Sequence, residues 1–322
     1  MEFTTKVQLI KPGFELSSQG QMLMMGSCFT DNIGAHFRDA MWPVAVNPCG
    51  VQFNPASICR VLQRALSDCP MVETELVERD GLWHSWLFDS HFSSADKAEV
   101  IRNVNDALTQ TRNALTQSSV VILTLGTSWV YRLVGTPDVV SNCHKFPSSQ
   151  FERYRLTVDE VAAMLVQTIA SIREINPEVR IIFTVSPIRH FKDGAHQNML
   201  SKSTLLLAID QVCQVVDRVD YFPAYEIVMD ELRDYRFYAS DMLHPNDVAI
   251  EYIWNTFKAS FFDDSTAQLV ARCERAYKRI EHRPFTDNFA EIEKFQNETA
   301  KVLNALADEH PHIKPVLQQY YK

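Results

Sequence analysis

The 322-residue sequence has no run of apolar residues that approaches the ~20 needed for a helix to span a bilayer. It also lacks a basic block, and its formal net charge is −9. An acidic chain without clustered lysine and arginine is poorly suited to nucleic acids or anionic membrane surfaces, so we expect neither as a partner. The first residues show no long apolar core behind a basic start, so we expect no signal peptide.

Cysteine pairs at metal-binding or redox spacing are also missing. The seven cysteines are odd in number and irregularly spaced, with no C-x-x-C pair. This pattern indicates neither a disulfide framework nor a zinc ribbon, and it favours reduced thiols in a cytoplasmic protein. The histidines likewise lack metal-ligand spacing, so we expect no metal centre. Internal repeats and low-complexity segments are absent too.

Short apolar runs, separated by helical patterns, are the main structural signal. Each run has the length of a buried strand, and strand–helix alternation predicts a doubly wound α/β sheet. In such sheets ligands bind beyond the carboxyl ends of the strands. The runs that we assign to strands are 22–25, 44–46, 120–125, 180–185 and 219–222.

Two helices of this sheet have clear starting signals. Thr157 and Glu160 form a capping box at the head of an apolar stripe, and a second helix begins at about Asp247. We expect one α/β domain over residues 1–262, with a mainly helical and polar insertion near 60–118. Residues 263–322 are predicted to be a helical extension, broken near Arg283-Pro284.

The stretch "MLMMGSCFTDNIG", residues 22–34, places Ser27 between the first strand and a helix. Unpaired N–H groups at the amino end of a helix favour negative charge, which is created when a serine oxygen attacks a carbonyl. Ser27 is therefore a candidate nucleophile, although strand-to-helix turns also use serine as an ordinary N-cap. Cys28 is a rival nucleophile that we rank lower, because we expect its side chain to pack inward with Phe29.

A second polar motif, Asp241-x-x-His244, lies just before the last helix of the sheet domain. A serine nucleophile needs a base, and the base needs a group that orients it. Asp241 can hold one imidazole nitrogen of His244 while the other faces Ser27. The pattern alone is weak evidence, because it is short and also suits an aspartate and a histidine in a surface turn. What supports a catalytic role is its position just before the last helix of the α/β domain.

These two motifs resemble the first and last blocks of the SGNH (GDSL-type) hydrolases. The chain resembles more closely the GSCFA family, whose name is nearly spelled by residues 26–30, with Thr30 in place of alanine. The resemblance covers roughly residues 5–262. It implies a three-layer α/β/α sandwich with a mainly parallel sheet and an esterase-like site. The other matching stretches are "VNPCGVQFNP" (46–55), "LTLGTSWVY" (123–131), "SNCHKFP" (141–147), "TVSPIRH" (184–190) and "DYRFYASDMLHP" (234–245).

The resemblance also implies an oxyanion hole. In the superfamily its donors are the serine N–H, a glycine after the second strand and an asparagine after the third. Gly50 fits the glycine position, whereas Ser128 stands where the asparagine would be. Four residues are therefore candidates for the side chain that donates a hydrogen bond to the oxyanion: Ser128, Asn142, Asn47 and Asn54. We favour Asn142.

Arg189 and His190 follow the fourth strand and are expected at the rim of the site, where they either bind an anionic or hydroxyl-rich substrate or shape the pocket. We interpret the protein as a serine esterase-type hydrolase that acts on a small-molecule or carbohydrate ester. The alternatives are an acyltransferase to a sugar or polymer hydroxyl and a non-catalytic binding module. This chemistry needs no cofactor, and self-association into a homo-oligomer is left open.

Overall fold

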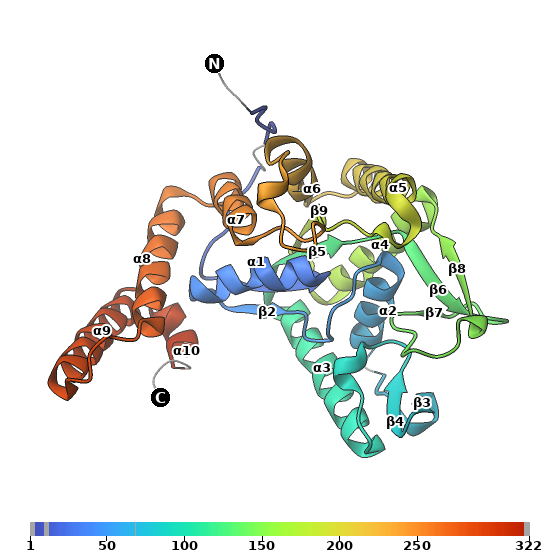
Figure 1. Ribbon diagram of the computed structural model, residues 1–322, viewed down its shortest axis with the longest axis horizontal. Coiled ribbons are helices and arrows are strands. Elements are labelled where there is room, and N and C mark those ends of the chain that lie inside the picture. Colours follow the sequence, from blue (N-terminus) through green and yellow to red (C-terminus); the bar gives the residue numbers. More distant parts are fainter. Residues whose placement is uncertain (1–3, 10–12, 68, 319–322) are drawn as a thin grey trace.

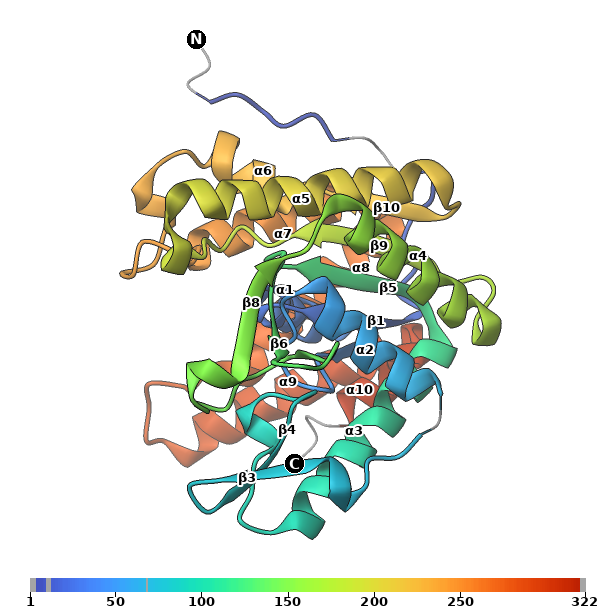
Figure 2. The same cartoon turned by 90° about the vertical axis from the view of Figure 1, so that its right-hand side faces the viewer.

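The central sheet has five parallel strands in the order β10-β9-β5-β1-β2. Figure 2 labels the first four of these strands. A computed structural model describes residues 4–9, 13–67 and 69–318. All five strands coincide with the predicted apolar runs, and the order of the strands reverses between β1 and β5. The carboxyl ends of these two strands therefore flank the crevice where doubly wound sheets bind ligands. The strands are β1 (Gln21–Gly26), β2 (Val44–Val46), β5 (Ser118–Leu125), β9 (Arg180–Val185) and β10 (Val219–Phe222).

Helices cover both faces of the sheet, which confirms the three-layer α/β/α architecture. Successive side chains of a strand point to opposite faces. Leu23 and Met25 pack with α2 (Pro55–Leu66), α3 (Lys97–Gln117), α4 (Val158–Ile175) and α5 (Gly194–Val215). Met22 and Met24 pack with α1 (Cys28–Asp39), α6 (Ala224–Glu226) and α7 (Asp247–Phe261). Burial on both faces explains why these strands are continuously apolar.

Helix starts follow the capping signals of the sequence. Thr157 accepts a hydrogen bond from the Glu160 N–H, and the Glu160 carboxylate accepts one from the Thr157 N–H, as the capping box predicts. Asn246 caps α7 by accepting from the Ala249 N–H. The cap therefore fixes the end of the loop that carries Asp241 and His244 at the start of α7.

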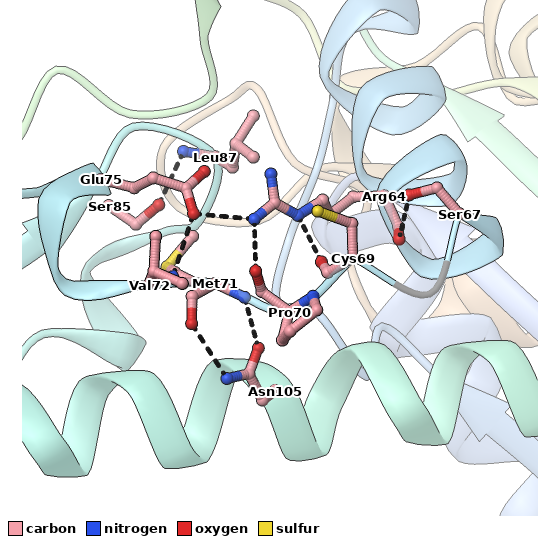
Figure 3. Close-up of polar contacts among 10 residues, drawn as sticks. All are labelled: Arg64, Ser67, Cys69, Pro70, Met71, Val72, Glu75, Ser85, Leu87 and Asn105. Carbon is pink, nitrogen blue, oxygen red and sulfur yellow. Dashed lines mark hydrogen bonds and ion pairs between the residues drawn. The ribbon is translucent and has the colours of Figure 1, made fainter.

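The segment between α2 and α3 contains an antiparallel hairpin, β3 (Leu76–Arg79) and β4 (Leu82–Ser85), that the sequence analysis did not predict. Figure 3 shows how the chain before it is held. The Arg64 guanidinium donates to the Cys69 and Pro70 carbonyl oxygens and pairs with the Glu75 carboxylate. On the other side, the Asn105 amide of α3 bonds both the N–H and the C=O of Met71. These contacts join α2 to α3.

A second small sheet, β7-β6-β8, follows β5 and was also not predicted. Its strands are β6 (Trp129–Leu133), β7 (Val139–Val140) and β8 (Phe151–Arg155). They are antiparallel, and the residues of β6 and β8 are partly buried, except for the buried Val130 and the exposed Glu152. Short strands that mix charged and aromatic residues carry little periodic signal, which is why the sequence did not reveal them.

The C-terminal residues form helices that lie together beside the sheet domain (Figure 1). They are α8 (Asp264–Glu281), α9 (Phe289–Glu309) and α10 (Lys314–Leu317). Their apolar stripes enclose the fully buried Met41, and the Trp254 indole N–H of α7 donates to Glu274 at 2.7 Å. Among the helices that the structure describes, none is both long and apolar enough to cross a membrane.

Candidate active site

The junction between β1 and α1 is held in one backbone conformation. Gly26 has a φ of 153°, and a Cβ at this position would lie 2.3 Å from the Thr124 carbonyl oxygen. A side chain is therefore excluded here, as a close backbone approach requires. The Asn47 amide supports the junction by accepting from the Gly26 N–H at 2.8 Å and donating to Asp31 at 2.7 Å. Asn47, considered above as an oxyanion donor, thus has both ends of its amide engaged.

Ser27 occupies the N-cap position of α1, but its side chain is buried. The residue is 3% exposed, and its Oγ has no hydrogen-bond partner among the described residues. Its N–H, expected to bind an oxyanion, donates to the Thr124 carbonyl oxygen at 3.3 Å. The structure therefore shows no hydrogen bond between Ser27 and His244.

Cys28 lies where Ser27 was expected. It is exposed, and its Sγ is 3.8 Å from Nε2 of His244. The prediction that Cys28 packs inward with Phe29 is wrong. Neighbouring helix residues project about 100° apart, and Phe29 takes the buried direction together with Ile33 and Phe37. Cys28 is therefore turned toward the loop that carries His244.

Asp241 and His244 form a tight pair in that loop. The carboxylate oxygen Oδ2 is 2.5 Å from Nδ1 of the imidazole, while Oδ1 accepts from the N–H groups of Leu243 and His244. These two N–H groups and the imidazole lower the pKa of Asp241 to about 2. When Nδ1–H of a neutral imidazole donates to the carboxylate, Nε2 is left as a proton acceptor that faces Cys28.

The other predicted oxyanion groups beyond the serine also have hydrogen-bond partners within the protein. Asn54 caps α2 by accepting from the Ser57 N–H. The Gly50 N–H donates to the Asn47 carbonyl oxygen at 2.8 Å. Asn142 accepts from the His144 N–H at 2.8 Å, as an ordinary turn residue does, and lies 3.4 Å from Ser90 Oγ. Ser128 is fully buried.

Ser128 is held by Ser201 of α5. Its N–H donates to Ser201 Oγ at 2.8 Å, and its own hydroxyl lies 3.2 Å from the same oxygen. The position that is asparagine in the SGNH pattern therefore anchors a helix in this chain. Among the described residues, no group of three or more His, Cys, Asp or Glu side chains is placed to hold a metal ion.

His190 lies over the carboxyl end of β5, near Gly126. Its Nε2 is buried and has no hydrogen-bond partner among the described residues. Burial, with the charges of Lys202 and His244, lowers the pKa of His190 to about 4. The imidazole is therefore neutral at ordinary pH, and Nε2 has no partner among the described residues.

Arg189 precedes His190 in the same loop and contacts Phe191 and Met229. Its guanidinium lies over the Phe191 ring, 5.5 Å from the ring centroid, and Nη2 is 3.4 Å from the Met229 sulfur. Its Nε is buried without a hydrogen-bond partner, and no carboxylate of the described residues forms an ion pair with it. Arg189 is therefore a positive charge without a carboxylate partner among the described residues, adjacent in sequence to His190.

Lys202 is a functional candidate that the sequence analysis missed. It belongs to α5 and is 1% exposed, and its ammonium donates to the Gly126 and Ser186 carbonyl oxygens, each at 2.6 Å. Burial lowers the pKa of Lys202 to about 7, against the opposing effect of Cys28. A single lysine inside a helical pattern gives no sequence signal, because only the fold brings it beneath β5 and β9.

The protein is a doubly wound α/β protein. Near the carboxyl end of β1, where the strand order reverses, the Cys28 thiol lies beside the His244 imidazole, which pairs with the Asp241 carboxylate. The model of the GSCFA family matches residues 21–257, and the chain belongs to this family. No curated protein matches the sequence.

Two solved structures are similar to the chain. One is a carbohydrate esterase family 3 from Talaromyces cellulolyticus, with 11% identity and a TM-score of 0.36, over 78% of this chain and 98% of that one. The other is an acetyl xylan esterase (Est2A) from the rumen bacterium Butyrivibrio proteoclasticus, with 11% identity and a TM-score of 0.33, over 74% of this chain and 62% of that one. At these values neither likeness bears on what this chain does.

Proposed function

We propose that this GSCFA family member is an esterase-type hydrolase, related to the SGNH hydrolases, that acts on a small-molecule or carbohydrate ester. The observation that carries the proposal is the Asp241–His244 pair, whose free Nε2 faces the junction between β1 and α1. An oriented imidazole beside a nucleophile-bearing helix start is the arrangement that acyl transfer chemistry requires.

In the proposed reaction a side chain of the junction attacks the ester carbonyl while His244 takes its proton. Asp241 keeps the imidazole oriented and stabilises the imidazolium. His244 then gives the proton to the departing alcohol oxygen, and in a second half-reaction it activates the water that releases the acid. A sugar hydroxyl in place of water would make the same site an acyltransferase.

The proposal is tested with p-nitrophenyl acetate and the variant His244→Gln. General-base catalysis contributes about 100-fold to 10,000-fold, so we expect kcat/KM to fall by at least about 100-fold. The matched control is His282→Gln, an exposed histidine of the C-terminal helices, which should leave the rate unchanged. Equal activity of wild type and His244→Gln would contradict hydrolysis at this site, and a wild-type rate no higher than that of buffer alone would favour a binding module. Acetyl appearing on an added sugar, instead of as acetate, would identify a transferase.

A further inference from the structure

The junction offers two adjacent side chains that could attack a carbonyl, and their surroundings differ sharply. Cys28 Sγ lies 3.8 Å from His244 Nε2, on the exposed side of the helix start. Ser27 Oγ is buried and has no hydrogen bond to any described residue. We infer that the nucleophile of this site is the Cys28 thiol rather than the Ser27 hydroxyl. This inference rests on the proposed function and specifies its chemistry.

The main chain around the buried Ser27 is held in place on both sides. The Gly26 conformation brings the chain against Thr124, and the Ser27 N–H bonds the Thr124 carbonyl oxygen. The Ser27 carbonyl oxygen in turn accepts from the Thr30 N–H at 2.7 Å, which begins the first turn of α1. On this fixed main chain the Ser27 hydroxyl is buried and without a partner among the described residues, whereas Cys28 already faces the base.

Groups of both signs act on the Cys28 sulfur. The N–H groups of Cys28 and Phe29, at the start of α1, face the thiol and favour its ionised form, as does the Lys202 charge beneath the sheet edge. Burial and the Asp31 carboxylate nevertheless raise the pKa of Cys28 overall. The resting group is therefore the thiol, and it becomes a strong nucleophile when His244 removes its proton during attack.

The steps balance with water as the only co-substrate. The Sγ–C bond forms as the S–H proton passes to His244 Nε2, giving a tetrahedral oxyanion near the helix N–H groups. The C–O bond to the alcohol then breaks, the alcohol oxygen takes the proton from His244, and a thioester to Cys28 remains. Water loses a proton to His244 and attacks the thioester carbonyl. The C–S bond breaks, and the sulfur recovers the proton as the acid leaves.

Two variants separate the candidates when p-nitrophenyl acetate is the substrate. We expect Cys28→Ala to lose at least about 100-fold in kcat, as for a nucleophile of a triad, and Ser27→Ala to lose far less. In the wild type, rapid quenching should trap an acetyl group on the tryptic peptide that holds Cys28. That adduct should be released by neutral hydroxylamine, as expected of a thioester. Loss of activity in Ser27→Ala with full activity in Cys28→Ala, or an acetyl adduct on Ser27, would overturn the inference.

A second measurement needs no turnover and so distinguishes failure of this inference from failure of the proposed function. Iodoacetamide should alkylate Cys28 at least about tenfold faster in the wild type than in His244→Gln, because the imidazole takes the thiol proton. Cys69 is the matched control, since it is also exposed, and it should react equally in both proteins. Equal rates at Cys28 in the two proteins would overturn the inference even if the protein hydrolyses esters.

Discussion

The Lys202 ammonium donates to the Gly126 carbonyl oxygen at 2.6 Å and thereby ties helix α5 to the carboxyl end of β5. A second bond of the same length, to the Ser186 carbonyl oxygen, extends the tie to β9. Two neutral carbonyl groups compensate only part of the cost of burying a full charge. This cost, opposed only in part by Cys28, is why the pKa of Lys202 falls to about 7.

Lys202 should make the stability of the fold depend on pH. In the unfolded chain the pKa of lysine is about 10.4, and in the folded protein that of Lys202 is about 7. Between these values the unfolded chain holds more protons, so the free energy of unfolding should rise with pH by up to about 1.4 kcal/mol per pH unit. Below pH 7 the contribution is constant.

Denaturant unfolding of wild type and Lys202→Met at pH 7, 8 and 9 checks this expectation. The variant should lack the rise that the wild type shows, because methionine fills the site without a titrating group. The exposed Lys294 of α9 supplies the control, and Lys294→Met should keep the wild-type slope. Parallel curves for wild type and Lys202→Met would contradict the lowered pKa.

Asp241 should act on the rate through His244 and not through its own titration. Its pKa of about 2 keeps the carboxylate ionised throughout the range in which the protein is assayed. Asp241→Asn should lower kcat for p-nitrophenyl acetate by about 100-fold or more, because the amide no longer fixes the donor at Nδ1. Asp247→Asn, in the first turn of α7, is the control and should keep its activity. Wild-type kcat in Asp241→Asn would contradict this role of Asp241.

The sheet could be predicted from the sequence, but the two added β-elements could not. Strands such as 180–185 are buried on both faces and are therefore continuously apolar, a strong signal. The strands of the hairpin and the second sheet, such as Leu76–Arg79 and Phe151–Arg155, alternate irregularly, and tertiary packing decides their conformation.

The site could be predicted only to the level of its location. The Asp241-x-x-His244 spacing predicts the contact between these two side chains, which the structure shows, because the pair lies within one loop. The choice between Ser27 and Cys28 depends on one helical step of about 100°, and Lys202 comes from a distant helix. Contacts of this kind depend on how the helices and strands pack together, so the local residue pattern does not predict them.

The C-terminal helices should stabilise the α/β domain. Met41, fully buried, packs against Leu269 and Cys273 of α8, and Glu274 accepts from Trp254. A chain that stops after Asp263 would expose Met41, at a cost of roughly 1.5–3 kcal/mol for this side chain alone, and should melt at a lower temperature. Thermal unfolding and sedimentation velocity provide the measurement. An unaltered melting temperature and sedimentation coefficient would show that these helices are dispensable.

Arg189 should select substrates that carry a negative charge. Its guanidinium forms no ion pair with the described residues, and its charge opposes the effect of burial on the pKa of Tyr238, in the loop that holds His244. A hydrogen bond to a charged group contributes about 1.5–3 kcal/mol, or roughly 10-fold to 150-fold in affinity. Arg189→Gln should therefore raise KM for 4-acetoxybenzoate, which bears a carboxylate, by about tenfold or more. KM for the neutral p-nitrophenyl acetate should stay unchanged, and Arg233→Gln, an exposed arginine, should change neither value. If Arg189→Gln raised both KM values equally, the guanidinium would be shaping the pocket and not reading the charge of the substrate.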